Sequence, residues 1–329
     1  MSSEFSRTVA DSEMVKTLNH VQALVEELSK QIVGQHTLIE SLLLSLISDG
    51  HLLIEGAPGL AKTKTVKSLA AAVGGSWSRV QFTPDLLPSD LTGQRVFNLA
   101  DSTFTTELGP VMCNFLLADE INRAPAKVQS ALLECMEERQ VTINNESFEL
   151  PKPFLVLATM NPFDSDGTYA LPSAQIDRFL LRVRLNYPDL SDELEIVRRS
   201  LDKSVNISKV LSTKSVLKMQ EMRTHIYVSK QVARFAVDLV RATRDLESVG
   251  LGGYSEYVTS GAGIRASLFL ITAAQAKALI SGRRSVELDD ILSVSSLVVA
   301  HRLILNYKAT LDGVIADDIV AKVAKSLTR

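Results

Sequence analysis

The sequence has few cysteines. Only Cys113 and Cys135 occur among the 329 residues, and they do not form a CxxC pair. Small secreted proteins use dense, paired cysteines as a disulfide framework, and thiolate zinc sites need closely spaced cysteines. The sequence therefore predicts neither feature, and its cysteine content fits a reducing compartment such as the cytoplasm.

Long apolar runs are also missing. The longest, such as Leu42-Leu43-Leu44, are far shorter than the roughly 20 residues that a membrane-spanning helix needs. The stretch from Met1 to Arg7 is polar and lacks the apolar core of a signal peptide. We therefore expect no membrane insertion and no secretion.

The sequence has no strong excess of charge of either sign. Lys and Arg number 35 against 38 for Asp and Glu, which gives a formal net charge of -3. This balance argues against a broad basic surface, so nucleic acid is not an expected partner. The five histidines have no metal-ligand spacing and predict no metal site of their own: His20, His36, His51, His225 and His301.

Hydrophobic residues make up 46% of the chain, and its length predicts two packed domains. Residues 1–30 contain an amphipathic helix, because apolar residues recur there at spacings of three and four. In 31–188, apolar strands alternate with helices, which predicts a mostly parallel α/β sheet with helices on both faces. The expected strands are 51–55, 79–82, 113–119, 154–160 and 180–185, with hairpin inserts at about 94–107 and 139–150.

Strand signals stop near Asn186-Tyr187-Pro188, and the remaining sequence has a helical period. The chain from 189 to 329 is therefore predicted to be a C-terminal all-α domain. Its expected helices are 191–203, 213–224, 229–247, 264–281, 287–305 and 313–327, with a glycine-rich loop over 250–263.

A glycine-rich stretch follows the first predicted strand. Its small residues let successive backbone N–H groups turn inward around phosphates, while the following helix directs its N-terminus at the negative charge. Lys62 would reach the β- and γ-phosphates of ATP, and Thr63 would bind Mg²⁺. A chance loop is the bland alternative, but the flanking strand and helix disfavour it. The predicted binding residues are Gly56, Ala57, Pro58, Gly59, Leu60, Ala61, Lys62, Thr63 and Lys64, with Ala61 replacing the usual glycine before the lysine.

Two carboxylates end the buried strand that begins near Cys113. Asp119 and Glu120 lie at a strand's carboxyl end, where doubly wound sheets bind their ligands. Asp119 would hold Mg²⁺, and Glu120 would polarise the attacking water as a general base. Solvated turn acids are the alternative reading, and the P-loop upstream makes it weaker.

Three further polar residues are candidates for the same chemistry. Asn161 ends the strand at 154–160 and could hold the water in line with the γ-phosphate, although Asn before Pro is also a common turn. Arg178 and Arg265 could spread transition-state charge, and such arginines often come from another subunit or domain. Taken singly, each arginine would more often be a surface or salt-bridge residue.

In combination, these residues resemble the AAA+ ATPases, and specifically the MoxR family in the helix-2-insert clade. The likeness covers roughly residues 31 to 280. Three ordered matches carry it: Val80-Gln81-Phe82-Thr83-Pro84-Asp85-Leu86-Leu87-Pro88-Ser89-Asp90-Leu91-Thr92-Gly93, then Leu117-Ala118-Asp119-Glu120-Ile121-Asn122-Arg123-Ala124-Pro125, then Gly167-Thr168-Tyr169-Ala170-Leu171-Pro172 leading to Arg178.

The resemblance assigns roles to individual residues. It implies Walker A at Lys62 and Thr63, Walker B at Asp119 and Glu120, and sensor 1 at Asn161. Arg178 resembles an arginine finger for a neighbouring subunit, and Arg265 resembles sensor 2 in a helical lid. Sensor 2 departs from the usual pattern, since Gly263-Ile264 replaces Ser-Pro. Arg123 is expected to form a structural salt bridge, and a reach across a subunit boundary is the alternative that stays open. The adenine pocket is expected at Ile32, Val33 and Gly34.

The resemblance also implies a function. Family members are chaperone-like ATPases that assemble into rings, usually hexamers, and mature other protein complexes with a partner that has a von Willebrand factor A domain. The two inserts usually face the pore or the substrate. Two alternatives stay open from the sequence: a DNA-directed motor, which no basic run supports, and a nucleotide-dependent switch or scaffold, which the complete Walker residues disfavour.

Overall fold

The computed structural model describes residues 11–57, 59–100, 102–161, 169, 171–201 and 206–328. The chain divides into two compact units, each of which is described by itself. The larger comprises Gln22–Phe179 and Val183–Leu217, and the smaller comprises Met1–Val21, Leu180–Arg182 and Lys218–Arg329. The domain limits expected after residues 30 and 188 remain predictions. Helix α1 (Asp11–Ser29) contains the predicted amphipathic helix and buries Met14, Val21, Leu24 and Leu28.

A five-stranded sheet forms the centre of the α/β fold, in the order β2-β5-β8-β1-β9. Its pairs β2/β5, β5/β8 and β1/β8 are parallel, as the alternation of strands and helices predicts. Because the strands run the same way, their carboxyl ends meet at one edge. The strands are β1 (Leu52–Gly56), β2 (Trp77–Gln81), β5 (Phe115–Asp119), β8 (Leu155–Met160) and β9 (Leu181–Leu185).

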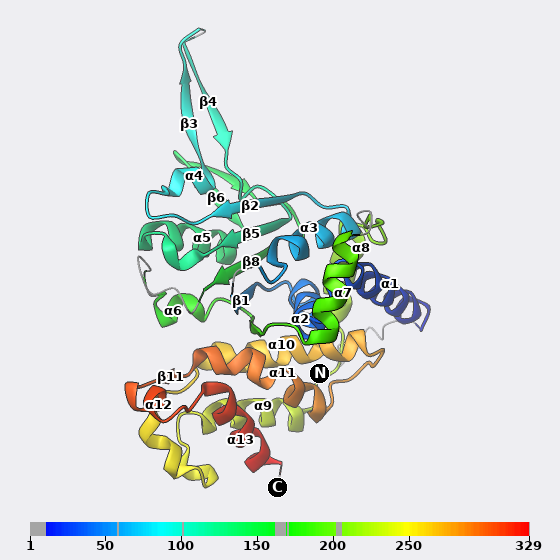
Figure 1. The fold of residues 1–329 in the computed structure, drawn as a ribbon, viewed down its shortest axis with the longest axis vertical. Coiled ribbons are helices and arrows are strands. Elements are labelled where there is room, and N and C mark those ends of the chain that lie inside the picture. Colours follow the sequence, from blue (N-terminus) through cyan, green and yellow to red (C-terminus); the bar gives the residue numbers. More distant parts are fainter. Residues whose placement is uncertain are drawn as a thin grey trace, which may run out of the picture. The chain divides into compact units, whose positions relative to one another are not determined.

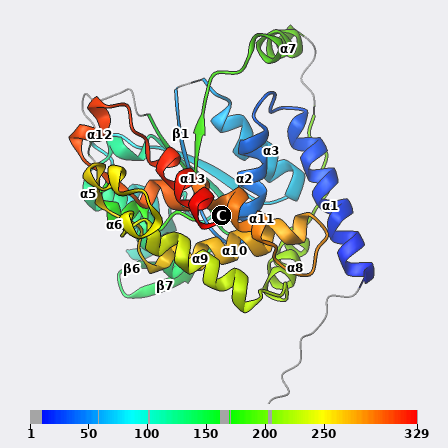
Figure 2. The ribbon, with the colours of Figure 1, turned by 90° about the horizontal axis from the view of Figure 1, so that it is seen from below.

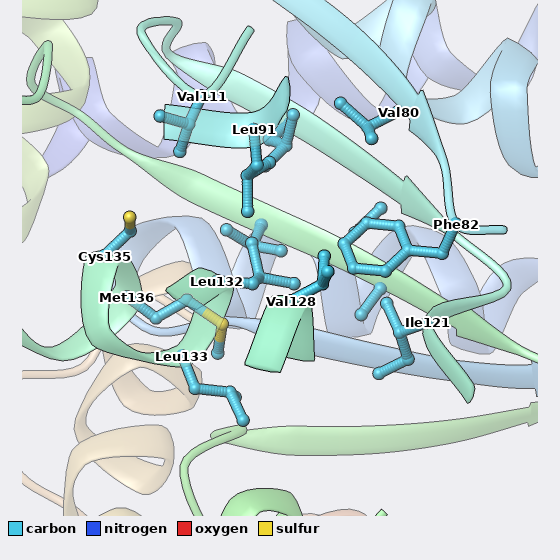
Figure 3. Packing of buried hydrophobic residues seen from close by; sticks show 14 of the residues in the cluster. Val80, Phe82, Leu91, Val111, Ile121, Val128, Leu132, Leu133, Cys135 and Met136 are labelled. Atoms are coloured by element: carbon cyan, nitrogen blue, oxygen red, sulfur yellow. The ribbon is translucent and has the colours of Figure 1, made fainter. Parts of the chain in front are cut away.

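Helices pack on both faces of the sheet because its inner strands are apolar on both sides. Helix α2 (His36–Ile47) contacts β1, and α3 (Lys62–Val73) contacts β2 and β5. Residues such as Leu116 of β5 and Val156 of β8 belong instead to a core cluster with α5 (Ala126–Glu138). Figure 3 shows part of this cluster, with Phe82, Ile121 and Val128 close together.

Two antiparallel hairpins interrupt the α/β pattern, within a residue of their predicted positions. The first pairs β3 (Gly93–Asn98) with β4 (Thr103–Leu108) after the short helix α4 (Pro88–Thr92). Figure 1 shows it extending away from the sheet, and its ring pair Phe97 and Phe104 is 44% and 56% exposed. The second pairs β6 (Gln140–Ile143) with β7 (Glu146–Glu149). Asp101, in the predicted turn of the first hairpin, lies outside the described residues.

His51 lies buried at the start of β1. Its Nδ1 accepts a hydrogen bond from the backbone N–H of Val156 at 3.0 Å, so the proton of the neutral ring is on Nε2. That nitrogen donates to the carbonyl of Met136 at 3.2 Å. Burial holds the pKa of His51 well below its usual value, and the nearby Arg139 lowers this pKa further. The fold therefore requires a neutral ring.

This arrangement predicts a pH-dependent stability. As the pH falls below about 6.5, the histidine of the unfolded chain takes up a proton that His51 in the fold cannot, so stability is lost by about 1.4 kcal/mol per pH unit. Urea unfolding between pH 7.5 and 5 should show a slope that is shallower in His51→Gln. His225→Gln, at an exposed position, should retain the full slope. Equal slopes in His51→Gln and the unsubstituted protein would contradict this account.

The smaller unit is built mainly from helices. Its helices α9 (Lys230–Ala242), α10 (Ile264–Ile280), α11 (Leu288–Val299) and α13 (Ala316–Leu327) pack against one another (Figure 2). The short helix α12 (Tyr307–Leu311) precedes α13, and α8 (Thr213–Thr224) starts before the limit between the units. In the described ranges, no helix is long and apolar enough to cross a membrane.

Two predicted helices in this region are too long. The one expected over 287–305 ends at Val299, and Ile304–Leu305 instead forms strand β11, which pairs antiparallel with β10 (Val258–Ser260). A short apolar run fits a helix or a strand equally well. Here the residues form a strand because β10 is available to pair with them. The helix expected over 229–247 ends at Ala242, where Thr243 turns its hydroxyl to the Val240 carbonyl and accepts from the N–H of Ala262.

Candidate active site

A cavity of about 780 Å³ opens in the larger unit, where β1, β5 and β8 end. The glycine-rich loop and the first turn of α3 form one side, and the two carboxylates after β5 form another. Helix α7 (Leu190–Leu201) and the segment before it close a third side. The lining residues are Gln31, Val33, Gln35, Gly59, Leu60, Ala61, Lys62, Thr63, Lys64, Arg79, Gln81, Asp119, Glu120, Asn161, Tyr187, Pro188, Glu193, Ile196 and Val197.

The loop between β1 and α3 turns through two left-handed residues. Gly59 has φ +86°, a conformation that glycine adopts without steric cost. Ala61, the N-cap of α3, has φ 56° and ψ 15°, which costs an L-residue about 1–2 kcal/mol. The missing glycine at position 61 is therefore tolerated with strain, and the turn still presents the N-terminus of α3 to the cavity. Pro58 lies outside the described residues.

Lys62 is the first residue of α3 and is partly buried. Its Nζ donates to the carbonyl oxygen of Gly56 at 2.6 Å, across the glycine-rich loop. Burial lowers the pKa of Lys62, while the charges of Asp119 and Glu120 act to raise it. Burial thus outweighs the two carboxylates in their effect on this pKa, and Lys62 lines the cavity together with both of them.

Thr159 holds the Asp119 carboxylate and the backbone of Glu120 in position. This residue is fully buried on β8, next to the end of β5. Its hydroxyl donates to Oδ1 of Asp119 at 2.6 Å and accepts from the backbone N–H of Glu120 at 2.8 Å. Oδ2 of Asp119 accepts two hydrogen bonds from Arg79 on β2.

Glu120 has the left-handed backbone conformation, with φ 56° and ψ 53°. This is strained for a glutamate, and such strain is concentrated at functional sites. Its Oε2 accepts from Nε2 of Gln81 at 2.9 Å and pairs with Nε of Arg123 at 3.1 Å. Arg123 therefore makes the structural salt bridge that the sequence suggested.

The cavity lining also includes apolar side chains, among them Val33, Tyr187 and two residues of α7, Ile196 and Val197. Only Val33 of the three residues expected around adenine lines the cavity. Ile32 is 2% exposed and belongs to the core. Gly34 packs against α7: a Cβ there would lie 2.3 Å from Oδ2 of Asp192, and its φ is +70°.

Neither of the two arginines is among the residues that line this cavity. Arg178 follows the short helix α6 (Ser173–Ile176) and pairs through Nη2 with Oε2 of Glu137 at 3.0 Å. Both line a separate hollow of about 280 Å³ between α5 and α6. Arg265 lies in the first turn of α10, in the smaller unit. Of the third sequence motif, residues 167, 168 and 170 lie outside the described ranges.

Comparisons with known proteins decide the family. Residues 51–181 match the family model described as "ATPase family associated with various cellular activities (AAA)", and 255–323 match the AAA lid domain. Chaperone MoxR1 of Mycobacterium tuberculosis is 44% identical over 93% of this chain and 81% of its own length. The chain belongs to the MoxR family of AAA+ ATPases.

Two further similarities support this assignment to the MoxR family. The uncharacterized protein YeaC of Bacillus subtilis is 37% identical over 92% of each chain. A crystal structure of a protein from Cytophaga hutchinsonii, assigned as an ATPase, superposes with a TM-score of 0.90 at 41% identity over 96% of each chain. The fold of this MoxR-family chain is thus an AAA domain followed by a helical lid.

Several residues of this MoxR-family cavity were not predicted from the sequence. Thr159 could have been recognised, since it is a polar residue inside the apolar strand at 154–160. Arg79 and Gln81 were also recognisable, because they are two residues apart in β2 and so lie on the same face of the strand. The α7 residues, in contrast, could not be recognised from the local sequence. Ile196 and Val197 look like ordinary apolar residues of an amphipathic helix.

The oxygen ligands of this MoxR-family cavity suit Mg²⁺. Thr63 and Asp119 line the same cavity, and hydroxyl and carboxylate oxygens are what this hard cation prefers. Mg²⁺ at nucleotide sites uses one or two protein ligands and completes its shell with water and phosphate oxygens. The residues present therefore fit the ion.

Proposed function

We propose that this MoxR-family chain binds ATP with Mg²⁺ and hydrolyses it to ADP and phosphate as a chaperone-like ATPase. One observation carries the proposal: Lys62, Thr63, Asp119, Glu120 and Asn161 come from three places in the chain, the start of α3 and the ends of β5 and β8, and line a single cavity. A phosphate-release assay with ATP, in the presence and absence of Mg²⁺, is the direct test. Absence of release from an assembled, folded sample would refute it.

Each residue has a separate task in the proposed reaction. Backbone N–H groups of the loop at 59–63 and the Lys62 ammonium hold the β- and γ-phosphates. Thr63 and Asp119 would hold Mg²⁺, which when bound neutralises charge on the phosphate oxygens. Glu120 accepts a proton from the attacking water, and Asn161 orients that water towards the γ-phosphate.

The apolar part of the cavity lining is the proposed adenine site. Val33, Tyr187, Ile196 and Val197 give it an apolar lining, and the side-chain amides of Gln31 and Gln35 supply polar edges. A mostly apolar pocket with a few polar groups is typical of sites for small molecules. We propose that Ile32 and Gly34 support the adenine site indirectly. Ile32 does so by packing in the core, and Gly34 by its close contact with α7.

Lys62→Ala should weaken ATP binding severely. Loss of the ammonium removes charge-assisted contacts to two phosphates, each worth about 1.5–3 kcal/mol, so we expect Kd to rise by at least roughly 100-fold. Titration with a fluorescent ATP analogue measures this directly. Lys67→Ala, exposed on the same helix and outside the cavity lining, is the control that should bind normally. Normal binding by Lys62→Ala would contradict the assignment.

We further propose that the protein works as a homo-oligomer, a hexameric ring in the cytoplasm, with a partner that carries a von Willebrand factor A domain and a client protein complex. The support is its membership of the MoxR family, together with Arg178, whose place outside the cavity suits a group that acts on a neighbour's nucleotide. Sedimentation with ATP tests the ring. ATPase rates with and without DNA at two salt concentrations test the DNA-directed alternative.

A further inference from the structure

Arg79 is a charged residue of the cavity to which the proposed reaction gives no task. It lies on the edge strand β2, where its backbone is level with Leu117 of β5. Asp119 is two residues further along β5, which is about 7 Å in a strand. The long arginine side chain spans that distance and ends at the Asp119 carboxylate.

Two nitrogens of the Arg79 guanidinium donate to the same oxygen of Asp119. Nη2 and Nε of Arg79 donate to Oδ2 of Asp119 at 2.7 and 3.2 Å, and Nη2 also donates to Oε1 of Gln81 at 3.0 Å. Thr159 already holds Oδ1 of the same carboxylate. Both oxygens of Asp119 are thus engaged, one by a buried hydroxyl and one by a cation.

The two partners of Asp119 differ in how easily they can leave. Thr159 is fully buried and also supports the backbone of Glu120, so its hydrogen bond is part of the core. The Arg79 side chain is 46% exposed, against 15% for Asp119. Arg79 can turn towards water without burying its charge, and the ion pair is therefore the exchangeable one.

We propose that Arg79 competes with Mg²⁺ for the Asp119 carboxylate and so sets the Mg²⁺ concentration at which nucleotide binds tightly. The inference rests on the proposed nucleotide site. A guanidinium and a hydrated Mg²⁺ need the same anionic oxygen, and each repels the other by charge. Arg79 is a positioning residue in this scheme, because it acts through Asp119.

The test measures binding of a fluorescent ADP analogue, which is not hydrolysed, during titration with MgCl₂. Arg79→Ala should reach half-maximal tight binding at about three- to tenfold lower free Mg²⁺, since a half-exposed charged hydrogen bond contributes modestly. Arg79→Lys keeps the charge but not the fork, so we expect a shift of about twofold. Arg95→Ala, exposed on the β3–β4 hairpin, makes the same charge change away from the site and should show no shift.

The outcomes separate this inference from the proposed function. If the Arg79 variants reach half-maximal tight binding at the same Mg²⁺ concentration as the unsubstituted protein, the inference is wrong, but the proposed function is not affected. Equal weakening of nucleotide binding in Mg²⁺ and in EDTA also overturns it, because Arg79 would then be a phosphate ligand. Failure of the unsubstituted protein to bind the ADP analogue at any Mg²⁺ concentration would overturn the nucleotide site itself. Should Arg79→Ala not fold, the shift in Arg79→Lys decides.

Discussion

Glu120→Gln should bind ATP with near-normal affinity and hydrolyse it about 100- to 10,000-fold more slowly, the range that a general base contributes. The amide keeps the size of the side chain and can still accept from Gln81, but it cannot take a proton from water. The left-handed backbone at residue 120 is unaffected by the exchange. Single-turnover phosphate release and analogue binding, measured on one preparation, separate the two effects.

A suitable control is Glu26→Gln, which makes the same exchange of a carboxylate for an amide at an exposed position on α1. It should leave both binding and turnover unchanged. If Glu120→Gln retained more than about a tenth of the turnover, another group would have to act as the base. The arrested variant should also hold its partners in ATP, so the proteins that copurify with it test the proposed von Willebrand factor A partner and client.

Arg178→Ala should bind ATP normally and lose about 1,000-fold in turnover, because an arginine that stabilises the transition state is worth at least that factor. Its guanidinium pairs with Glu137 in a hollow separate from the cavity, so its removal should leave the nucleotide contacts of its own subunit in place. Arg234→Ala, an 82% exposed arginine in an i,i+4 pair, is the control without effect.

Mixed oligomers test whether Arg178 acts across subunits. Arg178→Ala keeps an intact cavity, and Lys62→Ala keeps the arginine but not the phosphate contact. Each variant should be inactive alone, whereas a mixture should recover activity where a competent cavity meets a neighbour with Arg178. No recovery in a mixture shown to co-assemble, or full activity of Arg178→Ala alone, would contradict the shared site.

Local sequence was sufficient for the fold class and for the two motifs at the centre of the cavity. The strand at 52–56 and the helix from Lys62 are adjacent in sequence, and their hydrophobic periods differ, so the loop between them could be recognised. Asp119 and Glu120 were recognisable because a buried apolar strand ends there. Helix ends were predicted less well: the period of 287–305 continued past Val299, where pairing with β10 ends the helical run.

The remaining site depended on contacts between distant parts of the chain. The register of β2 on β5 brings Arg79 to Asp119 and Gln81 to Glu120, and β8 brings Thr159 to the Asp119 carboxylate and the Glu120 backbone. The packing of Gly34 against Asp192, far apart in sequence, leaves Val33 rather than Ile32 on the cavity wall. No periodic pattern in the sequence signals these contacts, because each one depends on how the elements pack.

The sequence by itself thus determined the α/β fold, the P-loop and the order of its polar strand ends, since these depend on neighbouring residues and their periodicity. Tertiary structure alone decided what holds those groups: a buried threonine between the Asp119 carboxylate and the Glu120 backbone, an arginine on Asp119, and Arg178 in a hollow of its own. The physical reason is that hydrogen bonds and ion pairs need atoms within about 3 Å, and only the packed chain sets such distances.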